Sequence, residues 1–238
     1  MTKILSIIPA RSGSKGIPNK NIRNFCGKPL LAYPIAIAKK SGLFDRIIVD
    51  TDSEEIAKVG IEFGAEAPYL RPKSLATDSA VVTDAVLLLL KRLAADGYES
   101  DIISLLQTTS PLREVEDVLS CWQLLKKPGV DSVVTVCESH PRFYHLAPDG
   151  KLNLVNRETE DIINRQQVEM GYMLNGCIVY IIKTAAFLKH KKFIYDGTYA
   201  VVCPKWRSVD LDYVEDWVHA EILYKNKEMI KKKIKSFG

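Results

Sequence analysis

The sequence predicts an α/β fold in which a mostly parallel sheet is covered by helices on both faces. Two observations point to it. Up to Val136, short apolar runs rich in Ile, Leu and Val alternate with longer segments of helical pattern. Capping and turn residues separate these segments, and the order is that of repeated strand–helix–strand units. A chain of 238 residues can bury such a core without disulfides or a structural metal.

Each expected element has a local signal. Apolar runs of about four to eight residues indicate strands, and the helices end at pairs such as Ser41-Gly42, Asp96-Gly97 and Pro128-Gly129. Capping residues in Thr51–Glu55 begin a short helix. The other elements, in order, are a strand over Ile4–Ala10, a helix over Leu30–Lys40, a strand over Arg46–Asp50, a helix over Thr83–Ala95, a strand over Asp101–Gln107, a helix over Val115–Lys127, strands over Ser132–Val136 and Gly176–Ile182, a helix over Thr184–His190, a strand over Tyr199–Cys203 and a final helix from about Tyr213.

We expect one domain over residues 1–238, with an insertion over residues 139–171. The insertion is polar and irregular, and Pro141, Pro148 and Gly150 interrupt it. A stretch of this length without regular periodicity is functional, or is a subdomain that needs a partner.

Composition and charge exclude several classes of protein. The net charge is +4, but residues 225–238 hold six lysines and one glutamate, so the basic character belongs to the C-terminus. We interpret this segment as a basic, solvated helix end and expect no nucleic-acid partner. The apolar run Ala85–Leu90 is too short to cross a bilayer, so we expect no membrane span. The five cysteines form no C-x-x-C motif, which argues against disulfide and zinc frameworks and favours the cytoplasm.

The segment Ala10–Asn21, after the first strand, has the composition of a phosphate-binding loop. Ligands of open α/β sheets bind beyond the carboxyl ends of the strands. Arg11, Lys15 and Lys20 offer cationic donors, and Gly13 and Gly16 allow a close approach of the backbone. The spacing matches neither the Walker A motif nor G-x-G-x-x-G.

Polar residues also follow the expected strand over Asp101–Gln107. Gln107, Thr109 and Ser110 suit either a ligand-lining turn or the N-terminal cap of the next helix. Arg165-Gln166-Gln167 and Asn175 suit either a carboxylate-bearing, hydroxyl-rich substrate or a solvated loop. Composition alone does not choose between these interpretations.

Two pairs of aspartates have the alternate spacing that turns both side chains to one side of a strand. For Asp50 and Asp52 we favour turn and capping chemistry. Asp210 and Asp212 are flanked by Val209 and Leu211, and burying two carboxylates without a cation is costly. For this second pair we favour binding of Mg²⁺.

Taken together, these motifs resemble the acylneuraminate cytidylyltransferases, also called CMP-sialic acid synthetases. The resemblance covers nearly the whole chain outside the lysine-rich end. Thr108 stands where many members have proline. The motifs are Ile8–Asn21, Leu75–Ser79, Leu106–Arg113, Arg165–Gln167, Asn175-Gly176 and Ser208–Asp212.

The resemblance implies a Rossmann-like three-layer α/β/α fold of the nucleotide-diphospho-sugar transferase type. It implies a small dimerisation and sugar-binding subdomain over residues 139–171, and hence a homodimer. The implied enzyme is a cytoplasmic nucleotidyltransferase of surface glycan biosynthesis. It would join CTP to a nine-carbon 2-keto sugar acid in a reaction that needs Mg²⁺, with Mn²⁺ as a substitute, and release pyrophosphate.

The resemblance also assigns roles to individual residues. Arg11, Lys20 and Asp212 would be catalytic, with Asp212 as an acceptor for the proton of the attacking hydroxyl. Asp210 and Asp212 would bind the metal. The nucleotide would be held by Arg11, Ser14, Lys15, Lys20, Asn21, Arg71 and Ser79, and the sugar acid by Gln107, Thr109, Ser110, Arg165, Gln166 and Asn175.

Three alternatives stay open. Related enzymes activate legionaminate, pseudaminate or 3-deoxy-octulosonate. A metal-dependent glycosyltransferase also places a D-x-D pair on a Rossmann-like sheet, but is not expected to have the Arg11–Asn21 loop. A non-catalytic module could bind nucleotide, or nucleic acid through the lysine-rich end.

Overall fold

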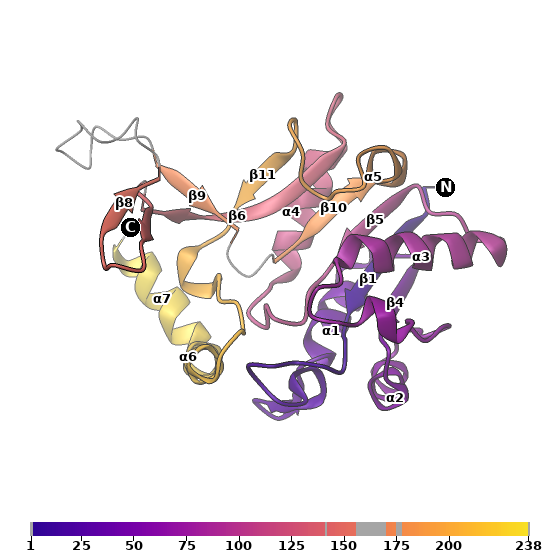
Figure 1. Ribbon diagram of the computed structural model, residues 1–238, viewed down its shortest axis with the longest axis horizontal. Coiled ribbons are helices and arrows are strands. Elements are labelled where there is room, and N and C mark those ends of the chain that lie inside the picture. The colour runs from indigo at the N-terminus through magenta and orange to yellow at the C-terminus, as the bar shows by residue number, and fades with distance from the viewer. Residues whose placement is uncertain (1, 141, 156–169, 175–177, 238) are drawn as a thin grey trace.

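The computed structural model describes residues 2–140, 142–155, 170–174 and 178–237 (Figure 1). Its centre is a seven-stranded sheet with the order β11-β6-β10-β5-β1-β4, in which β9 also pairs with β6. The strands of this sheet are β1 (Ile4–Pro9), β4 (Arg46–Asp50), β5 (Ile102–Leu105), β6 (Ser132–Ser139), β9 (Gly171–Met173), β10 (Tyr180–Lys183) and β11 (Tyr199–Val202).

The sheet is mostly parallel, as predicted. β1 pairs in parallel with β4 and β5, and β11 pairs in parallel with β6. β10 runs antiparallel to both of its neighbours, β5 and β6, and therefore leaves these two parallel to each other. The short strand β9 is also antiparallel to β6.

The helices cover both faces of the sheet. Alternate residues of β1 belong to different apolar clusters, because neighbouring side chains of a strand point to opposite faces. Ile4 and Ile8 pack with α1 (Ala32–Ser41), α2 (Glu54–Glu62) and α4 (Val115–Leu125). Leu5 and Ile7 pack with α3 (Val82–Ala95) and α5 (Thr184–His190) on the other face. Together with the sheet, these helices form the three predicted layers.

A third apolar cluster joins the C-terminal part of the chain to the loop after β1. Ile17 of that loop and Phe25 of β2 (Asn24–Phe25), which pairs with β3 (Lys28–Pro29), pack against Leu211 and Trp217. Trp217 lies on α6 (Val214–Lys225). The cluster places Asp210 and Asp212, on either side of the buried Leu211, beside the first loop.

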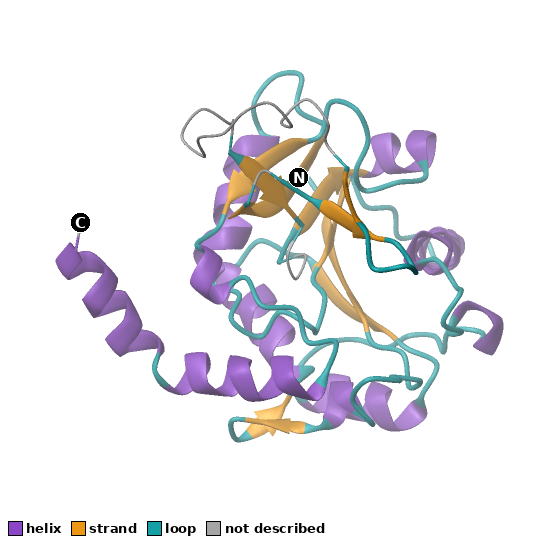
Figure 2. Ribbon diagram, turned by 60° about the vertical axis from the view of Figure 1, so that its left-hand side comes forward, coloured by secondary structure: helices purple, strands orange, loops and turns teal. Residues whose placement is uncertain are grey.

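The structure corrects two details of the expected elements. The insertion is not wholly irregular, because β7 (Tyr144–Leu146) and β8 (Leu152–Leu154) form an antiparallel hairpin. The final helix is two helices, since α6 ends at Lys225 and α7 (Lys227–Phe237) extends outward from the body (Figure 2). Among the described residues, no helix is long and apolar enough to cross a membrane.

Candidate functional site

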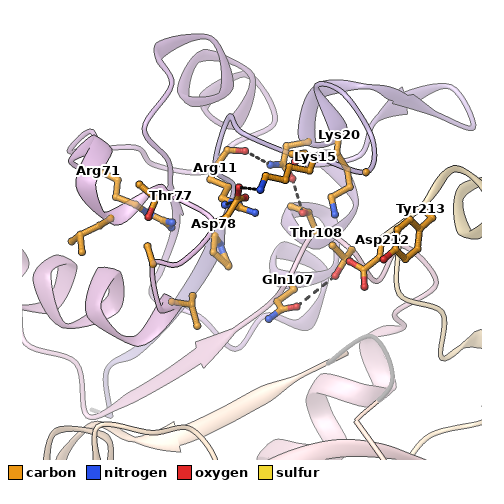
Figure 3. Close-up of a pocket in the computed structure, with 18 residues that line it drawn as sticks. Arg11, Lys15, Lys20, Arg71, Thr77, Asp78, Gln107, Thr108, Asp212 and Tyr213 are labelled. Carbon is orange, nitrogen blue, oxygen red and sulfur yellow. Dashed lines mark hydrogen bonds and ion pairs between the residues drawn. The ribbon is translucent and has the colours of Figure 1, made fainter. Parts of the chain in front are cut away.

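A pocket of about 540 Å³ lies beyond the carboxyl ends of β1, β4 and β5 (Figure 3). Four segments line it, and each follows a strand or connects to one. They contribute side chains of the loop after β1, residues between Arg71 and Val82, the turn Gln107–Thr109, and Asp212 with Tyr213. The pocket is therefore where the topology of an open α/β sheet places a ligand.

Hydrogen bonds and close backbone packing hold the first loop in place. The Asn21 side chain donates from Nδ2 to the Arg11 carbonyl (2.8 Å) and accepts from the Thr108 hydroxyl (2.6 Å). Thr108 thus joins the turn after β5 to the first loop through a side-chain hydrogen bond. A Cβ atom on Gly16 would lie 1.9 Å from the Asp212 carbonyl oxygen, so the loop can approach that segment only with glycine.

Two cations of this loop share one carboxylate. Asp78 forms ion pairs through Oδ1 with Nη1 of Arg11 (2.8 Å) and through Oδ2 with Nζ of Lys15 (2.6 Å). Figure 3 shows the three side chains meeting in the pocket. The hydrogen bond from Lys15, and then that from Arg11, hold the pKa of Asp78 below its usual value.

A third cation, Arg71, is fixed by a buried carboxylate. Its Nη2 donates to Asp50 Oδ2 (2.6 Å) and to the Asp50 carbonyl (2.9 Å). Burial raises the pKa of Asp50 although Arg71 acts in the opposite direction. The pair therefore keeps Arg71 at the pocket edge at a desolvation cost.

Turn and capping chemistry was predicted for Asp50 and Asp52, but neither carboxylate caps α2. Asp52 accepts hydrogen bonds from the backbone N–H (2.8 Å) and hydroxyl (2.6 Å) of Ser12 and so holds the first loop. The cap of α2 is Ser53, whose hydroxyl accepts from the Ile56 N–H. Sequence spacing alone could not tell which of these neighbouring polar residues reaches the helix and which reaches the loop.

Of the second aspartate pair, Asp212 lines the pocket and Asp210 does not. Asp212 is exposed and lines the pocket, whereas Asp210 is largely buried behind Thr109, and burial raises its pKa. The Lys20 ammonium donates to the Leu211 carbonyl (2.7 Å) between the two aspartates. Burial lowers the pKa of Lys20, while Asp212 and then Asp210 oppose that change.

The donor set around Asp210 fits a hard divalent cation. Asp210 Oδ1 is buried and has no hydrogen-bond partner in the described part of the chain, and the Thr109 side chain bonds the same carboxylate. Carboxylate and hydroxyl oxygens are ligands that Mg²⁺ and Mn²⁺ accept. The described residues contain no group of three or more His, Cys, Asp and Glu side chains placed for a metal. A cation here would need substrate oxygens to complete its shell.

Two buried arginines, Arg207 and Arg113, hold the segment before Asp210 and the turn after β5 in place. Arg207 forms a bidentate pair with Asp117 of α4, with N–O distances of 2.5 and 2.6 Å, three residues before Asp210. Arg113 donates to the Gln107 carbonyl (2.7 Å) and to the Ile178 carbonyl, so it joins the turn after β5 to the segment that leads into β10.

The structure brings most of the predicted site residues together. Ser79 is exposed beside Thr77 and does not line the pocket, and Ser110 is buried without a hydroxyl partner among the described residues. Arg165, Gln166 and Asn175 lie outside the described residues. The predicted residues that line the pocket are Arg11, Ser14, Lys15, Lys20, Asn21, Arg71, Gln107, Thr109 and Asp212.

The sequence assigned no role to Thr77, Asp78 or Tyr213, which also line the pocket, whereas Thr108 belongs to the polar run that was predicted to line a ligand or cap a helix. Asp78 lies in the motif Leu75–Ser79, so its position was indicated, but its two cationic partners were not. No spacing rule connects residue 78 with residues 11 and 15.

Comparisons with known proteins agree on the family and the fold. A cytidylyltransferase family model matches residues 5–231. The chain is 36% identical to a CMP-N,N'-diacetyllegionaminic acid synthase of Legionella pneumophila, with 93% of this chain and 96% of that one covered. It is 32% identical to a pseudaminic acid cytidylyltransferase of Campylobacter jejuni, with 94% and 97% covered.

A 34% identical N-acylneuraminate cytidylyltransferase of Streptococcus agalactiae is longer: the match covers 91% of this chain and 52% of that protein. Among solved structures, a CMP:2-keto-3-deoxy-manno-octonic acid synthetase complexed with CTP superimposes with a TM-score of 0.69. The match covers 95% of this chain and 100% of the other at 15% identity, which supports the shared fold.

Proposed function

The chain belongs to the cytidylyltransferase family, and from that premise we propose that it activates a nonulosonic acid, a nine-carbon 2-keto sugar acid, with CTP. The products are a CMP-sugar and pyrophosphate. One observation of the structure supports the proposal above the others: Arg11, Lys15, Lys20 and Arg71 line the same pocket as Asp212. A nucleoside triphosphate needs several cations, and a hydroxyl nucleophile needs a proton acceptor.

We propose the class of the sugar substrate, the nonulosonic acids, and not one particular acid. The relatives named above are described as acting on legionaminate, N-acylneuraminate and pseudaminate derivatives. All three names describe transfer of a cytidylyl group to an acidic sugar, and they differ in the sugar. Gln107 and Thr109, at the end of β5, lie in the pocket where they can donate to or accept from its hydroxyl groups.

The reaction is an in-line displacement at the α-phosphorus. The anomeric hydroxyl oxygen forms the new P–O bond, the bond to the bridging oxygen breaks, and pyrophosphate leaves with the electron pair. Asp212 accepts the hydroxyl proton, since its carboxylate is exposed in the pocket. Arg11 and Lys15 neutralise charge on the phosphates, and Lys20 does so beside the carboxylates. Asp210 and Asp212 would hold Mg²⁺ or Mn²⁺, which supplies further charge neutralisation when bound.

The test is pyrophosphate release from CTP and Mg²⁺ with N-acetylneuraminate, legionaminate, pseudaminate and 3-deoxy-octulosonate. We expect release with one nine-carbon acid and its loss in Arg11→Ala and Asp210→Ala. Arg23→Ala is the matched control, because Arg23 is exposed and stacks over Trp217 outside the pocket. Wild-type protein that binds CTP but releases no pyrophosphate with any acid would contradict the proposal. Turnover only with a glycan acceptor would identify a glycosyltransferase.

We also propose a cytoplasmic homodimer. The thiols of Cys26, Cys121, Cys137 and Cys203 are unpaired, which fits a reducing compartment. The insertion and the adjoining strand β9 expose large apolar side chains that a second copy would cover: Tyr144, Leu146, Leu152, Val155, Met170 and Tyr172. Sedimentation should give a dimer that Leu146→Glu with Leu152→Glu converts to a monomer. A wild-type monomer at micromolar concentration would contradict it.

A further inference from the structure

We infer that Asp78 determines the affinity of the phosphate site, as an internal anion that a nucleotide phosphate displaces from Arg11 and Lys15. The inference rests on the proposed function and deepens it. The carboxylate uses both of its oxygens, one for each cation. Carboxylate and phosphate groups use the same donors of arginine and lysine in similar geometries. Asp78 therefore occupies the donors that a phosphate group would use.

A second carboxylate–cation pair at the same pocket shows why Asp78 can leave. The Asp50 and Arg71 side chains are 7% and 6% exposed, so removing either partner leaves a buried charge. The side chains of Asp78, Arg11 and Lys15 are 43%, 35% and 82% exposed. Water can solvate these three groups when they separate, and exposed pairs of this kind are weak. Asp50 is thus a permanent partner of its arginine and Asp78 an exchangeable one.

The surrounding backbone allows the exchange. The Asp78 segment lies between η2 (Lys73–Leu75) and α3, and its backbone bonds are local turns: Ala76 N–H to the Lys73 carbonyl and Ala80 N–H to the Thr77 carbonyl. Rotation of the Asp78 side chain breaks neither bond. The two ion pairs are therefore what must be broken for the cations to turn to a phosphate.

This exchange favours ligands with several phosphate groups. A small anion must replace two charge-assisted contacts with few of its own, whereas a triphosphate also reaches Lys20 and Arg71 in the same pocket. Asp78 should therefore weaken the binding of every anion, and of pyrophosphate and inorganic phosphate most visibly. Between turnovers, Asp78 should also prevent solvent anions from binding to Arg11 and Lys15.

The experiment compares pyrophosphate binding to wild type, Asp78→Asn and Asp78→Glu by titration calorimetry, without sugar and without turnover. We expect Asp78→Asn to bind pyrophosphate and CTP about three- to tenfold more tightly, the range that two exposed ion pairs allow. Asp78→Glu keeps the charge and should stay near wild type. Asp131→Asn is the matched control, because Asp131 pairs with Lys183 at similar exposure away from the pocket.

Weaker or unchanged pyrophosphate binding in a folded Asp78→Asn variant would overturn the inference and make Asp78 a residue that positions the cations. Failure of the proposed function gives a different result: wild type would bind pyrophosphate yet form no CMP-sugar with any acid. The two ideas are therefore judged by separate measurements.

Discussion

The two sides of the pocket are built differently. The cation side, Arg11 and Lys15 with Asp78, consists of exposed side chains in pairs that water and ligands can replace. The carboxylate side consists of residues 207–212. The buried Arg207–Asp117 pair anchors its first residue, Leu211 is fully buried, and the Asp212 backbone contacts Gly16. The side that meets a large anionic ligand is adaptable, and the side that must hold oxygens at fixed positions is rigid.

The difference also has an energetic meaning. Burial raises the pKa of Asp210, so its ionised form is disfavoured where it lies, and the rest of the fold must compensate for it. Carboxylates with a pKa shifted in this way are typical of functional sites, and a cation bound beside Asp210 would stabilise its ionised form. The cation side has no such cost, since its charges are solvated.

The largest expected effect is on the carboxylate side. Arg207→Met removes the cation from a pair in which both side chains are under 10% exposed, and leaves Asp117 buried without its partner. We expect a loss of about 3–5 kcal/mol in the free energy of unfolding, measured in urea. Lys225→Met is the control, because the Lys225–Glu221 pair on α6 is exposed and contributes little to stability. Equal losses would remove the distinction between the two sides.

The next effect tests the contact between the sides. Gly16→Ala would place a methyl group 1.9 Å from the Asp212 carbonyl oxygen, so the loop or the carboxylates must shift. A displacement near 1 Å lowers kcat/KM by about a hundredfold. Gly13→Ala is the matched control, since a Cβ there meets nothing within 4 Å. Comparable activity in the two variants would show that the sides move independently.

A smaller, pH-dependent effect concerns Asp50 and Arg71. Since burial outweighs Arg71 and raises the pKa of Asp50, the folded protein takes up this proton before the unfolded chain as the pH falls. The carboxyl therefore favours the folded state at low pH, and this contribution is lost as the pH rises through the folded pKa, above 3.8.

The measurement is the unfolding free energy of wild type minus that of Asp50→Asn against pH. The difference should fall as the pH rises through that window, because ionised Asp50 is the form that burial disfavours. A difference that grows with pH would mean that the ion pair with Arg71 dominates over desolvation.

The smallest expected effect is the protection of the Cys203 thiol from chemical modification. Burial and the neighbouring Asp117 raise the pKa of Cys203 to about 12, so it is a thiol at pH 8 and unreactive toward alkylating reagents. We expect mass spectrometry to find Cys26 modified before Cys121, Cys137 and Cys203 in native protein. Arg207 acts to lower the pKa of Cys203, so Cys203 should stay a thiol in Arg207→Met, and faster labelling there would report local opening of the fold. Rapid labelling of Cys203 in wild type would show that the carboxylate side opens readily.

Local patterns predicted most of the fold. The strand over Arg46–Asp50 was placed to the residue, and Gly42 closes α1 in the left-handed conformation, with φ of 62°. The direction of β10 could not be predicted, because an apolar run has the same composition in either direction. The hairpin of β7 and β8 was missed because its strands have three residues each and are mostly exposed, which leaves little periodicity.

Most of the residues predicted for the site line the pocket, but the ion pairs that hold them in place were not predicted. The composition of Ala10–Asn21 indicated a phosphate loop, and its cations do line the pocket. Gly16 was expected to admit a ligand, yet the structure shows that it admits the backbone of residue 212. The pairing of Asp78 with Arg11 and Lys15, and of Asp117 with Arg207, depends on tertiary packing that joins distant segments. Sequence spacing does not contain that information.

The antiparallel course of β10 has a consequence for how such a protein can change. Because β9 and β10 both run antiparallel to β6, the connection between β6 and β10 begins and ends at the same end of the sheet. The entropy of closing a loop rises by only about 0.6 kcal/mol for each doubling of its length. That segment can therefore lengthen, shorten or be exchanged while the register of the sheet and the phosphate site stay as they are.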